Sequence, residues 1–456
     1  MTPFWSTERG HPAVNFTVRL LVGAICAIVP HAPAAAQVTM PPETTRGLFG
    51  STPHEEAKTQ LDLRASVIEG YDSDVTTALI STVDPGNLQS GGFSTMLDTG
   101  AMYAWRGKTQ VVANVNSVLR HYSDFGTTQS LGHRAGIGVT KTTVGGMTLL
   151  ANQSAAFSPT YFYNVFPGTS GTPLEVGSAG VTAPNYTVSD FASYTYTTMM
   201  SLSHTIGPRS SVAATGQFFY TNRVQETENW SDVSNYNVGG RYSRNTTRNL
   251  ALSTELQYRS GEYGHRAEGI TTEVALNFGV EYTRPFSATR RATMGVHVGV
   301  SGADYPGSEI GLAGFQRRYR TIGDASLSYP FSQNWTATGS IRRGLEYVSD
   351  LPTPVVSNGA TTSVTGLLTH RVDMNVLVGY ASGESILSSQ ALVFDTYTSS
   401  VRVRYAVSRT FAIFAEYFRY YYDFKNGVLL PPGMPPGLDR KGGRAGLTLW
   451  MPAVRR

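Results

Sequence analysis

The sequence predicts an all-β protein, a transmembrane up-and-down antiparallel β-barrel. Three observations lead to this prediction: an N-terminal export signal, apolar and polar residues that alternate along many segments, and connections that are alternately short and long. Beyond the signal, no apolar stretch reaches the ~20 residues that a transmembrane helix needs. A closed barrel is the other structure that satisfies every backbone group in lipid.

The N-terminus has the features of a cleavable signal peptide. A polar segment that carries Arg9 and Arg19 precedes an apolar run over 20–29. This run is about half the length of a transmembrane helix, so we expect it to be removed. The small residues that end at Ala36 suit signal peptidase, and Gln37 is the expected first residue of the mature chain.

The cysteine content fits an exported protein. The only cysteine, Cys26, lies in the apolar run of the signal. The mature chain is therefore expected to have no disulfide, no thiolate metal site and no thiol nucleophile.

Composition and charge narrow the function classes. The chain has 47 Gly, 25 Tyr and 20 Phe, a composition that favours strands over helices. Its formal net charge is only +4, and no basic cluster is interleaved with aromatic residues. We therefore expect no binding of nucleic acid.

Alternation with period two is clearest over 270–282. Apolar residues and polar residues occupy opposite faces there, and the pattern recurs at 250–259, 293–300 and 397–407. In a soluble barrel the apolar face would point inward, whereas in a membrane barrel it points to lipid. Alternation alone does not choose between these two arrangements.

Connection lengths favour the membrane barrel. Short connections are expected near 107–108, 145–146, 207–209, 246–247, 287–289, 332–333 and 408–409. Long ones are expected at 71–92, 160–189, 302–313, 349–360, 384–393 and 425–440. Short periplasmic turns and long extracellular loops are typical of outer-membrane barrels, and the count gives about 18 strands, within a range of 16–18. Aromatic residues at the strand ends, such as Tyr417 to Tyr422, fit the two interfacial girdles.

We expect four segments along the chain. They are a signal peptide at 1–36, a short periplasmic segment at 37–60, the outer-membrane barrel at 61–451 and a C-terminal tail at 452–456. The closing strand is expected at 444–451. The expected partners are outer-membrane lipid, lipopolysaccharide and the barrel-assembly machinery of a Gram-negative cell.

The polar faces of the strands predict an arginine-rich lumen. The expected substrate path is lined by Arg241, Arg259, Arg318, Arg320, Arg342, Arg402, Arg404, Glu273 and Glu281. Further inward charges are expected at Arg64, Arg120, Arg134, Arg444, Asp62, Asp98, Glu255, Asp324 and Glu346. A surplus of arginine favours anions. The alternative is that the arginines pair with the acids and stiffen the wall.

One hypothesis follows for selectivity. Arg318, Arg320, Arg402 and Arg404 are expected to form the selective constriction of the lumen. Reversal of their charge should then lower the preference for anions.

The sequence gives no indication of an enzyme. The nine histidines lie outside any G-x-S-x-G or H-E-x-x-H motif, and no group of acids and histidines has the spacing of metal ligands. We therefore expect no catalytic residue, no bound metal and no cofactor.

Several short motifs resemble the outer-membrane β-barrel proteins associated with exopolysaccharide or capsule export. The first strand leads into the aromatic and acidic segment 69–75, and Ser/Thr-Arg turns occur at 243–245, 247–249 and 408–410. The resemblance implies passage of an anionic polysaccharide out of the periplasm. It also implies a separate periplasmic scaffold of helical repeats, because this chain contains no such repeats.

Three function classes remain open. The first is a secretion channel for an acidic polysaccharide, and the second is a general diffusion porin for small anions or sugars. In a porin, the segment 160–189 could fold inward as a constricting loop. The third class is a non-conducting barrel that acts as an adhesin, a structural element or a lipid-modifying enzyme.

Overall fold

The computed structural model describes fifteen segments of the chain. These are residues 58–73, 77–78, 91–122, 128–143, 145–158, 188–189, 193–223, 232–263, 270–286, 291–306, 315–332, 334–347, 354–385, 394–424 and 437–456. Two predictions lie outside these residues: the signal peptide with its cleavage site at Ala36 and Gln37, and the inward loop at 160–189, of which only 188–189 are described.

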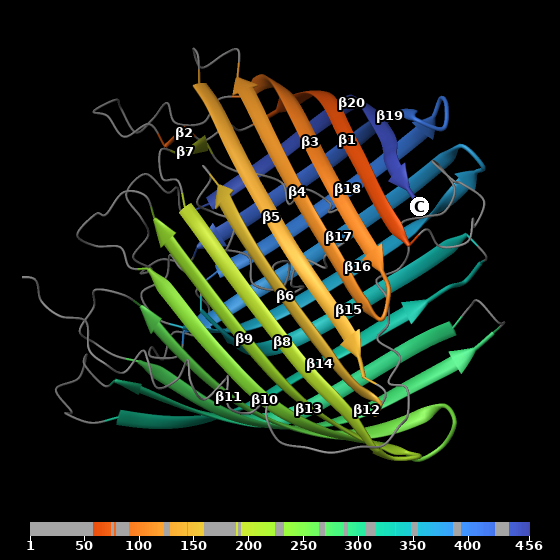
Figure 1. The fold of residues 1–456 in the computed structure, drawn as a ribbon. Helices are drawn as coiled ribbons and strands as arrows, with labels where there is room; N and C mark the ends of the chain where they lie inside the picture. The colour runs from red at the N-terminus through yellow and green to blue at the C-terminus, as the bar shows by residue number, and fades with distance from the viewer. Residues whose placement is uncertain are drawn as a thin grey trace, which may run out of the picture.

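Eighteen strands of the described residues form one antiparallel sheet (Figure 1). They are β1 (Thr59–Asp72), β3 (Gly92–Arg106), β4 (Thr109–Tyr122), β5 (Thr128–Thr142), β6 (Met147–Ser158), β8 (Ser193–Gly207), β9 (Ser210–Arg223), β10 (Val233–Asn245), β11 (Leu250–Tyr263), β12 (Thr271–Pro285), β13 (Arg291–Pro306), β14 (Phe315–Tyr329), β15 (Trp335–Glu346), β16 (Val355–Thr369), β17 (Val372–Ser385), β18 (Phe394–Ala406), β19 (Phe411–Phe424) and β20 (Gly437–Arg455). The two-residue strands β2 (Thr77–Ala78) and β7 (Val188–Ser189) pair separately, in parallel.

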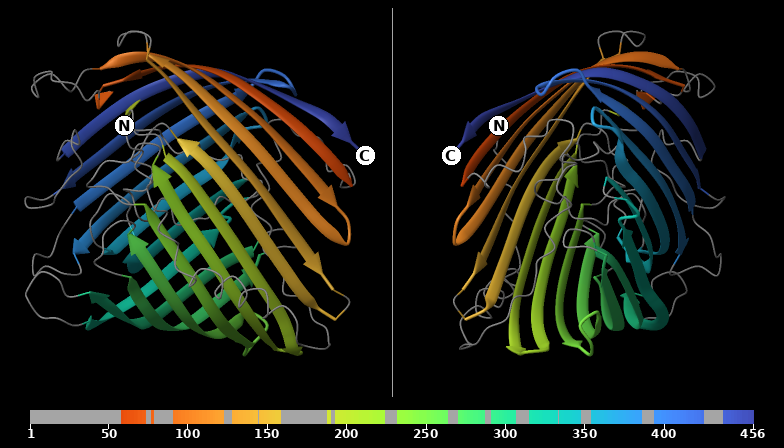
Figure 2. Two further views of the ribbon diagram at one scale, coloured as in Figure 1. Left: turned by 60° about the vertical axis from the view of Figure 1, so that its left-hand side comes forward. Right: turned by 90° about the vertical axis from the view of Figure 1, so that its right-hand side faces the viewer.

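The sheet closes on itself as a barrel. Each strand pairs with its neighbours in sequence order, and β1 pairs with both β3 and β20. The β1–β20 ladder runs from Gln60 opposite Arg455 to Asp72 opposite Gly442. Figures 1 and 2 show the resulting tilted, strongly twisted wall. The predicted fold class, an up-and-down barrel of about 18 strands, is confirmed.

Connections differ in length at the two ends of the barrel. At one end, here called the turn end, the strands are joined at 107–108, 143–146, 208–209, 246–249, 286–290, 330–334, 370–371 and 407–410. At the other, here called the loop end, the connections include 73–91, 159–192 and 425–436. The turn at 370–371 was not expected from the sequence, whereas the other turns lie at or beside their predicted positions.

Apolar side chains face outward along the strands. On β12, Leu276 and Phe278 are 42% and 59% exposed, whereas the inward residues Glu273 and Ala275 of the same strand are 4% and 3% exposed. The same alternation places Leu447 and Leu449 of β20 on the outer surface. A barrel that is apolar outside and polar inside has the faces of a membrane barrel, and the reverse of a soluble one.

Outward aromatic residues gather near both ends of the strands. At the turn end, Phe286 contacts Tyr329 with ring centroids 5.8 Å apart. At the loop end, Phe157 and Tyr194 have ring centroids 5.0 Å apart. Rings at two levels are the arrangement expected of the two membrane interfaces.

Three strand boundaries differ from the prediction. Strand β13 continues to Pro306, inside the expected loop 302–313, because its last residues pair with β14. Strand β20 starts at Gly437 and continues to Arg455, so the expected tail at 452–456 forms the end of the closing strand. Pro452 is tolerated there because it lies opposite Asp62 at an irregularity of the ladder. Strand β16 starts at Val355, inside the expected loop 349–360, because Val355 and Val356 pair with β15 and β17.

The described residues contain no helix long and apolar enough to cross a membrane.

The orientation of the faces predicts unequal effects for two adjacent substitutions on β8. Met200 is 43% exposed on the outer face, and Ser201 is the next, inward residue. Met200→Arg should lower the free energy of unfolding by about 2–4 kcal/mol, because it puts a charge in lipid. Ser201→Arg should change it by less than about 1 kcal/mol. Urea unfolding in lipid vesicles measures both, and equal losses would contradict the assignment of faces.

Candidate functional site: the inner wall

The inner wall carries the charged residues of the strands, and ion pairs connect most of them. Its charges are concentrated on β10–β20, β1, β3 and β4, whereas the strands from β5 to β9 present mainly small and uncharged inward residues, apart from Arg134. Asn152, Thr197 and Gln217 are examples from this neutral sector. The lumen therefore has a charged side and a neutral side.

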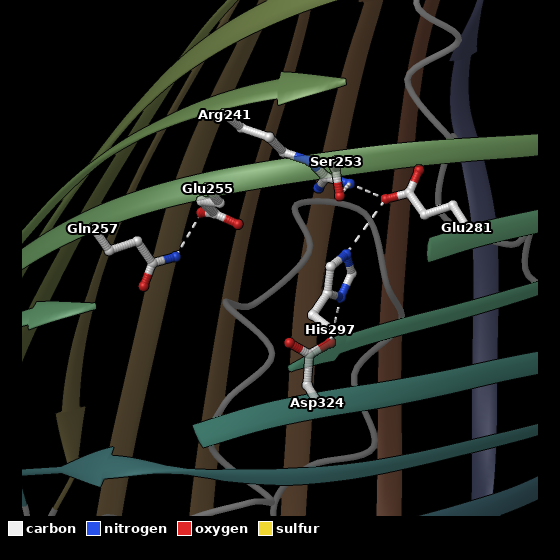
Figure 3. A network of polar contacts seen from close by, with 7 residues as sticks. All are labelled: Arg241, Ser253, Glu255, Gln257, Glu281, His297 and Asp324. Carbon is white, nitrogen blue, oxygen red and sulfur yellow. Dashed lines mark hydrogen bonds and ion pairs between the residues drawn. The ribbon is translucent and has the colours of Figure 1, made fainter. Parts of the chain in front are cut away.

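A polar network crosses five consecutive strands on the charged side (Figure 3). Arg241 of β10 is ion-paired with Glu281 of β12, and its guanidinium also donates to Ser253 Oγ at 3.3 Å. Glu281 Oε1 lies 3.6 Å from His297 Nε2 on β13. His297 Nδ1 is 2.9 Å from Asp324 Oδ2 on β14. The shared carboxylate of Glu281 thus connects an arginine with a histidine that has a second acid behind it.

A second set of contacts lies nearer the loop end of the same wall. Arg259 Nη1 of β11 is 3.3 Å from Glu273 Oε2 of β12. The same nitrogen donates to the backbone carbonyl of Leu345 at 2.5 Å. Leu345 belongs to β15, so this bond joins strands that are not neighbours in the wall.

Ion pairs also line the sector from β17 to β3. Arg404 of β18 is paired with Asp373 of β17, and Arg440 of β20 with Asp72 of β1. Arg64 Nη2 lies 3.1 Å from Asp98 Oδ2. Because each of these three guanidinium groups has a carboxylate beside it, the three pairs add little net charge to the wall.

Inward aromatic residues cover the loop-end half of β18 and β19. They are each at most 4% exposed: Phe394, Phe418, Tyr420, Tyr422 and Phe424. The rings of Phe394, Phe424, Tyr422 and Tyr420 contact one another in that order, in tilted or edge-to-face arrangements. The guanidinium of Arg444 lies 4.4 Å from the centre of the Phe418 ring. This part of the interior is packed, because covered aromatic side chains are not in contact with an open aqueous lumen. The expectation that the residues from Tyr417 to Tyr422 form a girdle is therefore wrong for the inward half of them.

The structure places every charged residue expected in the lumen at an inward position. The seven arginines and two glutamates of the expected path all have this orientation: Arg241, Arg259, Arg318, Arg320, Arg342, Arg402, Arg404, Glu273 and Glu281. Their direct partners differ. Arg320 and Arg342 are 3.8 and 3.7 Å from Glu384 and Glu346. Arg402 makes no hydrogen bond or ion pair of 4 Å or less within the described residues, although Glu416 lies opposite it in the ladder.

The four arginines of the expected constriction are not brought together. Arg318 and Arg320 lie in the loop-end half of β14, whereas Arg402 and Arg404 lie in the turn-end half of β18. Arg320 and Arg404 are paired with different acids. The hypothesis of one ring is therefore wrong for the described residues, because alternation fixes the face of a residue and not its height in the barrel.

Three inward acids were missed in the sequence analysis. Asp72, Asp373 and Glu416 lie opposite or beside Arg440, Arg404 and Arg402. A cross-strand register for the hairpin β18–β19 would have found Glu416, because the turn at 407–410 is short. They reduce the expected surplus of positive charge.

Within the described residues, no group of histidine, cysteine, aspartate and glutamate side chains is arranged to hold a metal ion. Paired charges on a barrel wall instead provide fixed dipoles and hydrogen-bonding groups along a path. The fold and the inner wall together define a porin-like β-barrel.

Known proteins resemble this chain in structure only. No protein-family model and no curated protein sequence matches it. The ferric-catecholate import receptor Fiu of E. coli K12 is 9% identical with a TM-score of 0.39, over 88% of this chain and 82% of that one. OccK2 (OpdF) of Pseudomonas aeruginosa, solved with glucuronate, is 9% identical with a TM-score of 0.42, over 88% and 100%. OpdO of the same organism is 10% identical with a TM-score of 0.41, over 87% and 98%. Identities and TM-scores this low are no basis for assigning a function.

The shared carboxylate of the network gives a prediction for stability. Glu281→Gln leaves Arg241 and His297 without their common acid and should lower the free energy of unfolding by about 1 kcal/mol. Glu255→Gln is the matched control, because Glu255 accepts only from the neutral amide of Gln257, at 2.5 Å. Urea unfolding in vesicles compares the two, and an equal effect would show that the network contributes nothing specific.

Proposed function

We propose that the protein is an outer-membrane channel that passes small polar solutes. The observation that supports it best is the closed 18-stranded barrel, apolar outside and lined inside by polar and ion-paired residues. A barrel of this strand number is too wide for side chains alone to fill. The interior therefore leaves room for solutes to pass between the inward side chains.

The location follows from the outer surface. Exposed Leu, Val and Phe side chains cover the middle of the strands, and aromatic rings lie toward both ends. Such a surface is stable in a bilayer and unstable in water. The outer membrane of a Gram-negative cell, reached with a cleaved signal peptide and the barrel-assembly machinery, is the location we propose. Lipid and lipopolysaccharide would then surround the barrel.

Two features of the interior favour small solutes over a polymer. The aromatic patch from Phe394 to Phe424 occupies the loop-end half on the side of β18 and β19. On the opposite side, the ends of β15 and β16 reach across to the inner face of β11, where Leu345 accepts from Arg259. Because the lumen is narrowed from these two sides, we expect solutes to pass along the sector of β5–β9.

Export of an anionic polysaccharide, with a separate periplasmic scaffold, is the second candidate. The inward arginines support it, since a guanidinium binds carboxylate and sulfate well. However, most of these arginines already have a carboxylate beside them, as in Arg404 with Asp373 and Arg241 with Glu281. The paired wall thus favours a porin with modest selectivity.

Permeation of the refolded mature chain tests the channel directly. In a planar bilayer we expect steady single-channel conductance, and in liposomes we expect swelling that falls steeply from mono- to oligosaccharides. A silent bilayer, with folding confirmed by heat-modifiable gel mobility, would identify a non-conducting barrel. Passage of a long acidic polysaccharide would identify the exporter.

Selectivity should depend on the arginine that has no direct partner. Arg402→Gln should lower the anion-to-cation permeability ratio about twofold, because it removes a positive charge that has no ion pair among the described residues. Arg419→Gln is the control, since Arg419 lies on the neighbouring strand but faces outward and is paired with Asp439. The reversal potential in a salt gradient measures both. An unchanged ratio for the Arg402 variant would remove this residue from the path.

A further inference from the structure

The ladder between β14 and β15 is incomplete. It pairs Gly323–Tyr329 with Ala337–Arg343 and stops there, although β14 continues toward the loop end as far as Phe315. Residues 315–322 pair with β13 on one side and have no partner strand on the other within the described residues. An unpaired edge is unfavourable in a membrane barrel, because its backbone groups lack hydrogen-bond partners.

The missing part of the wall lies inside the barrel. The inserted segment, defined as residues 344–347 of β15 with 355–358 of β16, leaves the wall where the ladder stops. Its residues Val355, Val356 and Ser357 are consecutive and at most 2% exposed, so both faces of β16 are covered there. A strand in the barrel wall would have one of these faces exposed.

Contacts with the inner wall hold the inserted segment. Leu345 and Val356 pack with Ala303 of β13 in a small apolar cluster, and Arg259 donates to the carbonyl of Leu345. Tyr347 donates its hydroxyl to the carbonyl of Thr271 at 3.3 Å. The Tyr347 ring rests on Gly261, where an added Cβ would lie 1.9 Å from Tyr347 Cε1. The outward faces of β15 and β16 therefore pack against the inner faces of β11 and β13.

The same residues also suit the vacant edge of β14. Continuing the observed register by four residues would place Gly344 opposite Ile322, Leu345 opposite Thr321, Glu346 opposite Arg320 and Tyr347 opposite Tyr319. Leu345 and Tyr347 would then face lipid, with Tyr347 beside Tyr319, which is 70% exposed at present. Glu346 would face the lumen directly across from Arg320, as an opposite-charge pair.

The ion pairs of the inserted position are loose. Arg320 lies 3.8 Å from Glu384 and Glu346 lies 3.7 Å from Arg342. In the wall position Arg320 and Glu346 would exchange these partners for each other. Gly344 of β15 follows the last paired row, and Gly359 of β16 lies opposite Arg342, one row before it. Glycine in a strand accommodates the bend that such a movement needs.

We propose that the inserted segment is a gate with two positions, one inside the lumen and one in the wall against β14. In the lumen position it narrows the channel, and the edge of β14 at 315–322 has no partner strand among the described residues. In the wall position it completes the β14–β15 ladder and widens the channel. The gating role rests on the proposed channel function. The two positions of the segment do not depend on that function and are tested separately.

Disulfide trapping distinguishes the two positions, in a Cys26→Ser background. Ala303→Cys with Leu345→Cys reports the lumen position, and Thr321→Cys with Leu345→Cys reports the wall position. Ala325→Cys with Ile341→Cys is the positive control, because these residues are paired in the existing ladder. The measured quantity is the initial rate of disulfide formation in vesicles, with the linked peptides identified by mass spectrometry.

The expected result is that both test pairs form. Gly261→Ala should raise the rate of the wall pair at least about threefold, because the new methyl group displaces Tyr347 from its contact. Gly100→Ala is the matched control on the opposite side of the barrel, where the added Cβ would meet only Val115 O at 3.4 Å and Asn116 Nδ2 at 3.5 Å. It should leave the rate unchanged.

Formation of the lumen pair alone, even with Gly261→Ala, would overturn the gate. The conductance of the two cross-linked proteins distinguishes failure of the gate from failure of the proposed channel function. If the wall pair forms but neither locked protein conducts, the gate stands and the channel is wrong. If both pairs form and the barrel conducts, the wall-locked protein should conduct more than the lumen-locked one.

Discussion

The closed backbone ladder is the constraint on which the rest of the structure depends. In lipid, every N–H and C=O group must be paired within the protein, so the first and last strands have to meet. Strand β1 does this with thirteen register pairs to β20, from Gln60 to Asp72. Additional bonds between the backbones of Thr59 and Arg456 secure the turn end of this ladder. Closure in turn fixes which face of each strand meets lipid.

Once the faces are fixed, the chemistry of each face follows. The exposed Leu276 and Phe278 suit an outer face that a bilayer would cover, and Glu273 on the inner face is stabilised by Arg259 at 3.3 Å. The same rule explains why the network around Glu281 connects neighbouring strands. Most ion pairs of the inner wall join strands one or two positions apart, where cross-strand side chains meet. Arg320 with Glu384 and Arg342 with Glu346 are exceptions.

Much of the fold could be predicted from the sequence. The side-chain period of a strand is two, so the alternation over 270–282 gave the correct face for Glu273 and Glu281. Turn residues such as Gly207-Pro208-Arg209 marked the short connections, and these gave the strand number. Alternation and turn residues can be recognised within one segment of the sequence, without knowing how that segment pairs with its neighbours.

The arrangement of the candidate site could be predicted only in part. Whether Arg318 and Arg402 share a level depends on the stagger of the strands, which no local pattern encodes. The pair of Arg440 with Asp72 joins opposite ends of the chain and needs the closed barrel to exist first. The insertion of Leu345 was hidden for a different reason: its alternation is that of a wall strand, and it fits both positions.

The central claim is that the apolar face of the barrel meets lipid and the polar face meets water. Single cysteines at 274–278 of β12, labelled with a fluorophore, test it most directly. Quenchers carried by lipid should act at 274, 276 and 278, and an aqueous quencher should act at 275 and 277. The opposite phase, or no alternation at all, would contradict the account, because the barrel would then be a soluble one or wrongly oriented.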